Sequence, residues 1–118
     1  MKTVSIYGLK NCSTCTKAIK WLQANDYDVE FIDYRANPIN AVTLQQWAPL
    51  VGGWEKLINR ASMTWRNLPA ERKNPDSDEQ WLGIATEFPS AIKRPIAVTR
   101  DGQVFLGFSE KNYALQFK

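Results

Sequence analysis

Two cysteines in the motif Cys12-Ser13-Thr14-Cys15 carry the clearest chemistry of this 118-residue chain. Thiols at positions i and i+3 lie one helical turn apart, which is the spacing of a redox-active pair. At the start of a helix, unpaired backbone N–H groups and the positive end of the helix dipole favour a thiolate over a thiol. We therefore predict that Cys12 is a nucleophile and that Cys15 can resolve a mixed disulfide formed on Cys12.

The same two cysteines also fit less reactive interpretations. They could be small apolar side chains of a core, or half of a zinc site. The chain has no His and no third Cys, so it cannot complete the usual set of four zinc ligands, and we expect no metal site. The neighbouring Asn11 and Thr14 could hydrogen-bond the sulfur or a substrate, or could serve only the geometry of the loop.

The segments around the motif indicate how it is positioned. Val4 and Ile6 alternate with polar residues and predict a strand over residues 3–7, and Gly8 provides a loop before the cysteines. Apolar residues at helical spacing predict a helix from residue 13 to about 24, and residues 29–34 predict a second strand. The opening third is therefore a βαβ unit with a parallel pair of strands.

Helical signals fill the middle of the chain. The capping pattern Thr43-x-x-Gln46 predicts a helix through residue 50, and residues 54–58 predict a shorter helix. A polar stretch over residues 71–78 predicts an exposed connector, after which Ser77-x-x-Gln80 predicts the start of a further helix. These segments together predict a helical insert over approximately residues 40–90.

The last third of the chain predicts a hairpin and a helix. Strands at residues 96–99 and 104–106 are joined through Asp101-Gly102, which is the preferred content of a type I′ turn, and Ser109 can cap a helix to about residue 117. The whole order predicts an α/β protein with a thioredoxin-like fold. Its plan is βαβ…ββα with a mixed four-stranded sheet, and the 118 residues form a single domain that contains the helical insert.

Lys93-Arg94-Pro95 enters the third predicted strand. In this architecture the proline is commonly cis and faces the cysteine loop, although trans X-Pro bonds are favoured by about 0.5–1 kcal/mol in general. A cis bond would hold Arg94 against Cys12, where the guanidinium could stabilise the thiolate and bind an oxyanion through two hydrogen bonds. Pro95 then belongs to the substrate-binding residues. The alternative is a solvated arginine at the start of a strand.

Charge and hydrophobicity limit the classes of partner. A formal charge of +3 is too small to indicate nucleic acid, but it suits a small anionic substrate. The chain begins with a strand signal and not with a charged and apolar leader, and no apolar run approaches about 18 residues. We therefore expect a cytoplasmic protein that makes no contact with a membrane, in a compartment where thiols stay mostly reduced.

These residues resemble the arsenate reductase (ArsC)/Spx family, and within it the YffB-like branch. The similarity covers essentially the whole chain. Its motifs are Tyr7-Gly8-Leu9-Lys10-Asn11-Cys12, Asp33-Tyr34-Arg35, Leu57-Ile58-Asn59, Thr64-Trp65-Arg66-Asn67-Leu68, Ile92-Lys93-Arg94-Pro95 and Leu106-Gly107-Phe108-Ser109. The resemblance implies a nucleophile at Cys12 with an arginine at Arg94 beside it. Members of the ArsC branch reduce arsenate with glutathione and glutaredoxin, and YffB-like members resemble glutathione-dependent thiol reductases.

The chain departs from the family pattern at three places. Cys15 stands where YffB-like proteins usually have an apolar residue, which brings the chain nearer to Spx. The usual insert motif Asn-x-Arg-Gly-Thr-Thr-Trp-Arg is replaced by residues 59–66, so the insert arginine has moved to Arg60 or has been lost. The third arginine of the ArsC branch, after the last strand, is replaced by Leu106-Gly107-Phe108. Efficient reduction of arsenate is therefore less expected than the family name suggests.

The sequence thus predicts a thiol oxidoreductase. The Cys12 thiolate would attack an oxyanion or a disulfide, and glutathione or Cys15 would resolve the adduct, while Arg94, with Arg60 or Arg66, holds the anionic group. Glutathione is then a co-substrate, glutaredoxin is a candidate partner, and no bound cofactor is expected. The alternative is an Spx-like redox switch that binds the C-terminal domain of the RNA polymerase α subunit through an exposed strand edge and the Gly52-Gly53 loop.

Overall fold

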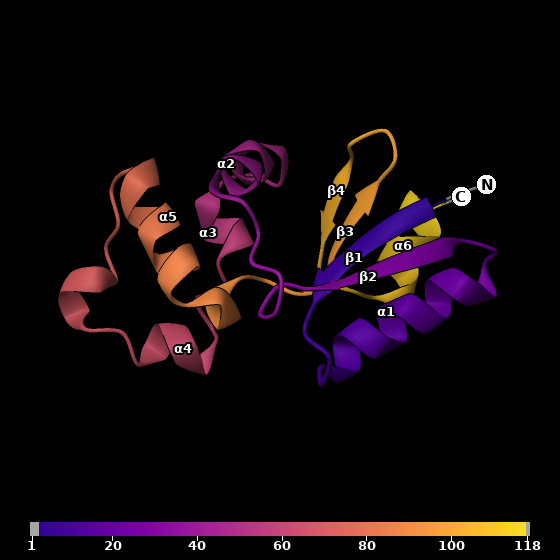
Figure 1. The fold of residues 1–118 in the computed structure, drawn as a ribbon, viewed down its shortest axis with the longest axis horizontal. Helices are drawn as coiled ribbons and strands as arrows, with labels where there is room; N and C mark the ends of the chain where they lie inside the picture. Colours follow the sequence, from indigo (N-terminus) through magenta and orange to yellow (C-terminus); the bar gives the residue numbers. More distant parts are fainter. Residues whose placement is uncertain (1–2, 118) are drawn as a thin grey trace. The chain divides into compact units, whose positions relative to one another are not determined.

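The computed structural model describes residues 3–117, and the chain divides into two compact units. The first unit contains the residues up to 34 together with those from 94 onwards, and the second contains residues 35–93. The four strands belong to the first unit, and the second is built from short helices (Figure 1). Each unit is described by itself below.

The first unit is a mixed four-stranded sheet. Its strands β1 (Thr3–Gly8), β2 (Asp28–Asp33), β3 (Ile96–Thr99) and β4 (Val104–Leu106) lie in the order β2-β1-β3-β4. Strand β2 is parallel to β1, whereas β3 is antiparallel to both β1 and β4. Helix α1 (Ser13–Ala24) connects β1 to β2, and α6 (Glu110–Gln116) follows β4. This arrangement is a thioredoxin-like fold, as the sequence predicts.

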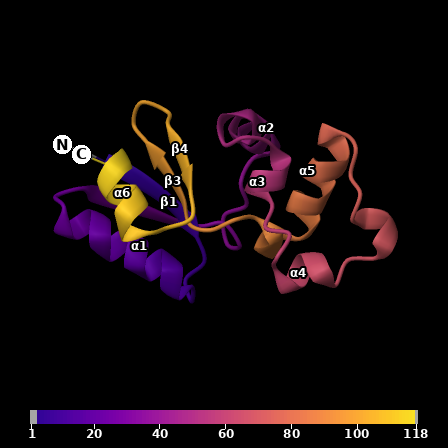
Figure 2. The same ribbon diagram turned by 180° about the vertical axis from the view of Figure 1, so that it is seen from behind.

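Helices α1 and α6 lie beside the strands of the sheet (Figure 2), and one hydrophobic cluster joins the sheet to both helices. Val4 and Ile6 are buried while their neighbours along β1 are partly exposed, because successive side chains of a strand point to opposite faces. The buried members of the cluster are Val4, Ile6, Ala18, Leu22, Ala97, Tyr113 and Phe117. Since both helices share this cluster with the same residues of β1, α1 and α6 cover one face of the sheet.

The second unit contains four short α-helices. They are α2 (Ala41–Leu50), α3 (Trp54–Leu57), α4 (Met63–Arg66) and α5 (Asp78–Glu87), with 3₁₀ turns at Ala70–Arg72 and Pro89–Ala91. Three tryptophans join α3 and α4 to α5: Trp65 stacks on Trp81 with ring centroids 5.7 Å apart, and the Trp54 indole donates to the Asp78 carboxylate at 2.9 Å. The predicted cap at Ser77 is confirmed, because its hydroxyl accepts from the Gln80 N–H at 3.2 Å.

The predicted start of the first insert helix was wrong. Helix α2 begins at Ala41, and its N-cap is Asn40, whose side chain accepts from the Val42 N–H at 2.8 Å. The pattern Thr43-x-x-Gln46 lies inside the helix. An asparagine that captures the N–H two residues ahead satisfies an unpaired donor earlier in the chain, and the helix therefore starts there.

The predicted type I′ turn between β3 and β4 was also wrong. That turn needs positive φ at both central residues, but of the two only Gly102 has it, with φ of 88°. The Thr99 carbonyl accepts from the Gly102 N–H at 3.1 Å, and the Thr99 N–H donates to the Gln103 carbonyl at 3.0 Å. The strands are therefore joined by a three-residue loop that ends in a left-handed glycine.

Within residues 3–117, the structure has no helix with the length and apolar character that crossing a bilayer requires.

Gly8 makes room for Cys15 where β1 ends. A Cβ atom at position 8 would lie 2.4 Å from the Cys15 sulfur, which is too close for any real contact. The carbonyl of Gly8 accepts from the Tyr34 N–H at 3.1 Å, so the backbone of this glycine is also held by the residue that follows β2. The first turn of α1 is thus packed directly against the end of the strand that precedes it.

We expect Gly8→Ala to lower the free energy of unfolding by about 1–3 kcal/mol, the usual cost of overpacking. Urea denaturation measures this change. In a Cys15→Ala background the sulfur is absent, so the added methyl group should cost much less. Gly83→Ala is the matched control, because a Cβ there meets nothing within 4 Å and alanine is the better helix former. An equal loss in both Cys15 backgrounds would show that the contact with sulfur is not the cause.

Candidate active site

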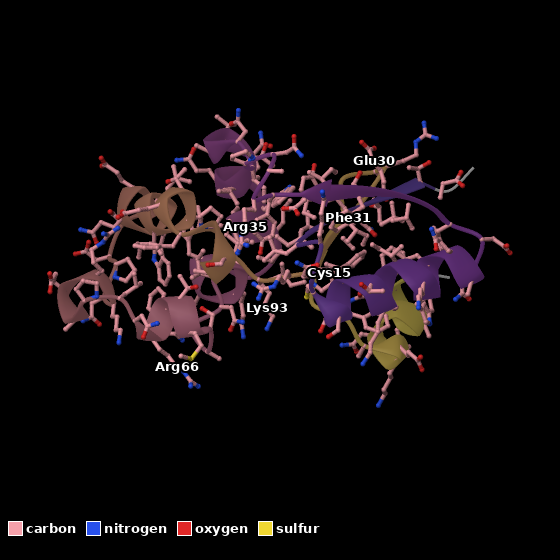
Figure 3. All side chains as sticks on the ribbon, turned by 60° about the horizontal axis from the view of Figure 1, so that its bottom comes forward. Cys15, Glu30, Phe31, Arg35, Arg66 and Lys93 are labelled. Atoms are coloured by element: carbon pink, nitrogen blue, oxygen red, sulfur yellow. The ribbon has the colours of Figure 1, made fainter. Side chains whose placement is uncertain are left out.

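The cysteine loop is fixed by backbone hydrogen bonds at both ends. The Cys12 N–H donates to the Leu9 carbonyl at 3.2 Å, and the Cys12 carbonyl accepts from the Thr16 N–H at 3.1 Å. Cys12 is the N-cap residue of α1, and Cys15 lies in the first turn of that helix (Figure 3). The Lys10 N–H also donates to the Asp33 carboxylate at 3.3 Å, which ties the loop to the end of β2. The predicted position of the motif, between a strand and a helix, is confirmed.

The environment of Cys12 favours a thiolate. Burial by itself would raise the pKa of this half-buried thiol, but four neighbouring donors act in the opposite direction. These donors are the N–H groups of Cys15 and Thr14, the Cys15 thiol and the Arg94 guanidinium, and the resulting pKa lies below the ordinary value. Donors at a helix start and a nearby cation are the expected causes of a reactive cysteine.

Cys15 has the opposite character. Its side chain is only 2% exposed, and both cysteines are free thiols. Burial, together with the neighbouring Cys12, raises the pKa of Cys15 to about 11, although the Leu9 backbone acts in the opposite direction. At neutral pH, Cys15 is therefore a thiol that donates a hydrogen bond to the Cys12 sulfur. The two cysteines of the motif differ in both accessibility and pKa.

Arg94 reaches Cys12 from the segment before β3. Strand β3 pairs with β1 so that Ile96 lies opposite Tyr7, which brings the preceding residues next to the end of β1. The Arg94–Pro95 peptide bond is cis, and Pro95 is fully buried with its carbonyl accepting from the Gly107 N–H at 2.9 Å. Burial would lower the pKa of Arg94, but hydrogen bonds to Tyr34 and Cys12 raise it, so the guanidinium stays charged.

The structure thus brings Cys12, Cys15, Arg94 and Pro95 together in the first unit. The Thr14 N–H contacts the Cys12 sulfur, whereas Asn11 is an exposed residue of the loop. Arg60 and Arg66 are exposed residues of the second unit, and their part in binding substrate stays a prediction. Among the described residues, no group of three or more His, Cys, Asp or Glu side chains could hold a metal ion.

Two residues with a part in this geometry were missed by the sequence analysis. Gly8 provides the space for the Cys15 sulfur, and Tyr34 contacts Arg94 through its hydroxyl. The signal for Tyr34 was its place directly after β2, since the carboxyl ends of two parallel strands lie at the same edge of a sheet. A tyrosine at such a place is also an ordinary core residue, and sequence alone does not separate the two roles.

A family model, two relatives and a solved structure each match almost the entire chain. The model of the ArsC family matches residues 7–115. An uncharacterized protein of Haemophilus influenzae is 40% identical over 114 residues, which are 97% of this chain and 98% of the relative. The global transcriptional regulator Spx 1 of Lactococcus lactis is 28% identical over 110 residues, covering 91% and 83%. The solved structure of a YFFB protein is similar with a TM-score of 0.87 and 31% identity, covering 98% of this chain and 99% of that one.

We expect Arg94→Ala to raise the pKa of Cys12, because a charged donor to the thiolate is removed. At pH 7 the thiolate fraction then falls, and alkylation by iodoacetamide should slow about fivefold. This factor corresponds to about 1 kcal/mol, the usual net free energy of one hydrogen bond. The whole pH–rate curve should move to higher pH. Mass spectrometry of the alkylated protein measures the rate.

The control for this experiment is Arg100→Ala, which removes the same charge from an exposed turn. Cys12→Ser is the blank, because the buried Cys15 thiol should not react in the native protein. A pH–rate curve that is the same for Arg94→Ala and Arg100→Ala would rule out a role of Arg94 in activating the thiol.

Proposed function

Since the chain belongs to the ArsC family, we propose that it is a glutathione-dependent thiol oxidoreductase with Cys12 as its nucleophile. The observation that carries this proposal is the environment of the Cys12 sulfur, which is half-buried at the N-cap of α1 and whose pKa is lowered by the donors at the start of α1 and by Arg94. A thiolate of this kind is the reactive form of cysteine in disulfide exchange. The proposal implies a compartment, such as the cytoplasm, that keeps free thiols reduced.

The reaction proposed for a disulfide substrate has two exchange steps. The Cys12 thiolate attacks one sulfur of the disulfide substrate, an S–S bond forms to Cys12, and the other half of the substrate leaves as a thiolate. A second thiol then attacks the substrate sulfur bonded to Cys12, or the Cys12 sulfur itself, and the mixed disulfide breaks. Glutathione, the thiol of a glutaredoxin, or Cys15 could supply this second thiol, and Cys15 would do so by closing a disulfide with Cys12.

Cys15 is suited to act second and not first. With a pKa of about 11, roughly one part in ten thousand of this thiol is ionised at pH 7. The nearby Cys12 contributes to that raised pKa through its charge and its hydrogen bond. Both contributions end when Cys12 is bound in a disulfide, so Cys15 becomes easier to ionise only after the first step. The order of reaction is thus set by electrostatics.

An oxyanion such as arsenate is the second substrate class included in the proposal. A guanidinium binds the edge of an oxyanion through two parallel hydrogen bonds, and Arg94 already lies beside the attacking sulfur. The thiolate would form a sulfur–arsenic bond while a hydroxyl of the arsenate takes up a proton and leaves as water. The thiol of glutathione would then attack the Cys12 sulfur, so that a Cys12–glutathione disulfide forms and the sulfur–arsenic bond breaks with its electron pair staying on arsenic, which leaves as arsenite. Arg60 and Arg66 are the proposed additional cations, and they would bind either the oxyanion or a carboxylate of glutathione.

Native mass spectrometry after incubation with glutathione disulfide tests the proposal. We expect one glutathione adduct on Cys12, which accumulates in Cys15→Ser because the resolving thiol is missing, and no adduct in Cys12→Ser. The wild type should show less adduct and some closed Cys12–Cys15 disulfide. Failure of both cysteines to react would contradict the proposed function, since glutathione disulfide needs only an accessible thiolate.

A second candidate function is an Spx-like redox switch. Two observations favour it: the Cys15 thiol is hydrogen-bonded to the Cys12 sulfur, and a relative named as a global transcriptional regulator covers 91% of the chain. In this reading the disulfide controls binding to the C-terminal domain of the RNA polymerase α subunit, and turnover is not required. The exposed edge of the sheet and the Gly52-Gly53 loop would provide the surface.

The switch predicts that the purified α-subunit domain binds this protein differently in its reduced and oxidised forms. Surface plasmon resonance with each form would measure the difference, and Cys15→Ser, which cannot close the disulfide, should bind the same under both conditions. Rapid glutathione-linked turnover together with no binding in either form would leave the oxidoreductase as the function.

A further inference from the structure

Tyr34 takes no part in the reaction proposed above, although its position is tightly fixed. It directly follows β2, its side chain is 0% exposed, and its N–H donates to the Gly8 carbonyl at 3.1 Å. Gly8 in turn lies against the Cys15 sulfur. The backbone of Tyr34 is therefore held at the same edge of the sheet as the cysteine loop, and its side chain is enclosed by the protein.

The hydroxyl of Tyr34 is hydrogen-bonded to the Arg94 guanidinium. Burial raises the pKa of Tyr34, so at neutral pH the phenol is uncharged and its oxygen accepts an N–H from the guanidinium. Another N–H of the same guanidinium donates to the Cys12 sulfur. Arg94 thus has two hydrogen-bonding partners, the buried phenol of Tyr34 and the sulfur of Cys12.

Three titratable side chains interact with Arg94, one from the end of β2 and two from the start of α1. Tyr34 follows β2, Cys12 caps α1, and Cys15 lies in the first turn of α1. Of these three groups, Cys12 loses its proton at the lowest pH, because the pKa values of Tyr34 and Cys15 are raised and that of Cys12 is lowered. The pH dependence of reactions at this site therefore reports the Cys12 thiol.

We propose that Tyr34 is a positioning residue, which holds the Arg94 guanidinium in hydrogen-bonding contact with the Cys12 sulfur. An arginine side chain has several rotatable bonds, and at a half-buried site water competes for its N–H groups. A fixed acceptor on the far side of the guanidinium restricts these rotations, so the N–H groups that face Cys12 stay aligned with the thiolate. The inference rests on the proposed function only for the role of Cys12 as nucleophile.

Tyr113 provides a matched comparison within the same unit. Its side chain is 1% exposed, and its hydroxyl has no hydrogen-bond partner among the described residues. Both tyrosines are therefore buried phenols, but only the hydroxyl of Tyr34 contacts Arg94. Tyr→Phe at each position removes one oxygen and keeps the ring. The pair separates the hydrogen bond to Arg94 from the general effect of removing a buried hydroxyl.

The test measures the pH–rate profile of Cys12 alkylation by iodoacetamide in the full chain. For Tyr34→Phe we expect a rate about twofold to fivefold lower at pH 7 and a profile moved to higher pH. The reason is that a less well aligned Arg94 would lose part of the free energy of its hydrogen bond to the Cys12 sulfur. For Tyr113→Phe we expect the wild-type profile. Thermal unfolding of both variants establishes that each is folded at the temperature of the assay.

A double-mutant cycle with Arg94→Ala decides whether Tyr34 acts through the arginine. We expect Tyr34→Phe to cause no further loss of rate when Arg94 is already absent. An equal loss in both backgrounds, or no loss in either, would overturn the positioning role. Alkylation does not depend on turnover, so this pattern would support the role of Tyr34 even if glutathione disulfide formed no adduct and the proposed function failed.

Discussion

The site depends on one interaction, the stabilisation of a partly desolvated thiolate at Cys12. Burial opposes the charge, and the donors that offset it come from separate parts of the chain: the N–H groups at the start of α1, the Cys15 thiol and Arg94. The sheet brings them together because β1 lies between β2 and β3. The loop after β1, the residue after β2 and the residues before β3 consequently share one edge.

The two thiols show how burial and hydrogen bonding compete within a single helical turn. Both are desolvated, but the donors at the start of α1, with the Cys15 thiol and Arg94, lower the pKa of Cys12. Cys15 is enclosed against Gly8, and burial together with the neighbouring Cys12 raises its pKa to about 11. The donors and not the degree of burial alone therefore decide which sulfur has the lower pKa.

Features with a local cause could be predicted from the sequence. The place of the cysteines before α1, the caps at Ser77 and Ser109 and the four strands follow from periodicity and from side chains that act within a few residues. The prediction failed where two local signals competed, as at Asn40 and Thr43, or where the turn depended on the conformation of one glycine. Contacts between distant segments left no local signal in the sequence. The contact of the Tyr34 hydroxyl with Arg94 and the space beside Gly8 for the Cys15 sulfur are two such contacts. In a sequence, a tyrosine after a strand usually indicates a core residue and a glycine usually indicates a turn, so neither residue type predicted its contact.

The arrangement also gives a physical reason for the order in which the thiols would act. In the reduced protein, the charge at Cys12 and the hydrogen bond that it accepts both keep Cys15 protonated. Bonding of Cys12 to another sulfur removes its negative charge, and Arg94 then has one fewer anionic partner. The remaining positive charge lowers the cost of a thiolate at Cys15, since Arg94 already acts in that direction. The same guanidinium that stabilises the first nucleophile would therefore assist the second, and Tyr34 would hold it in place through both steps.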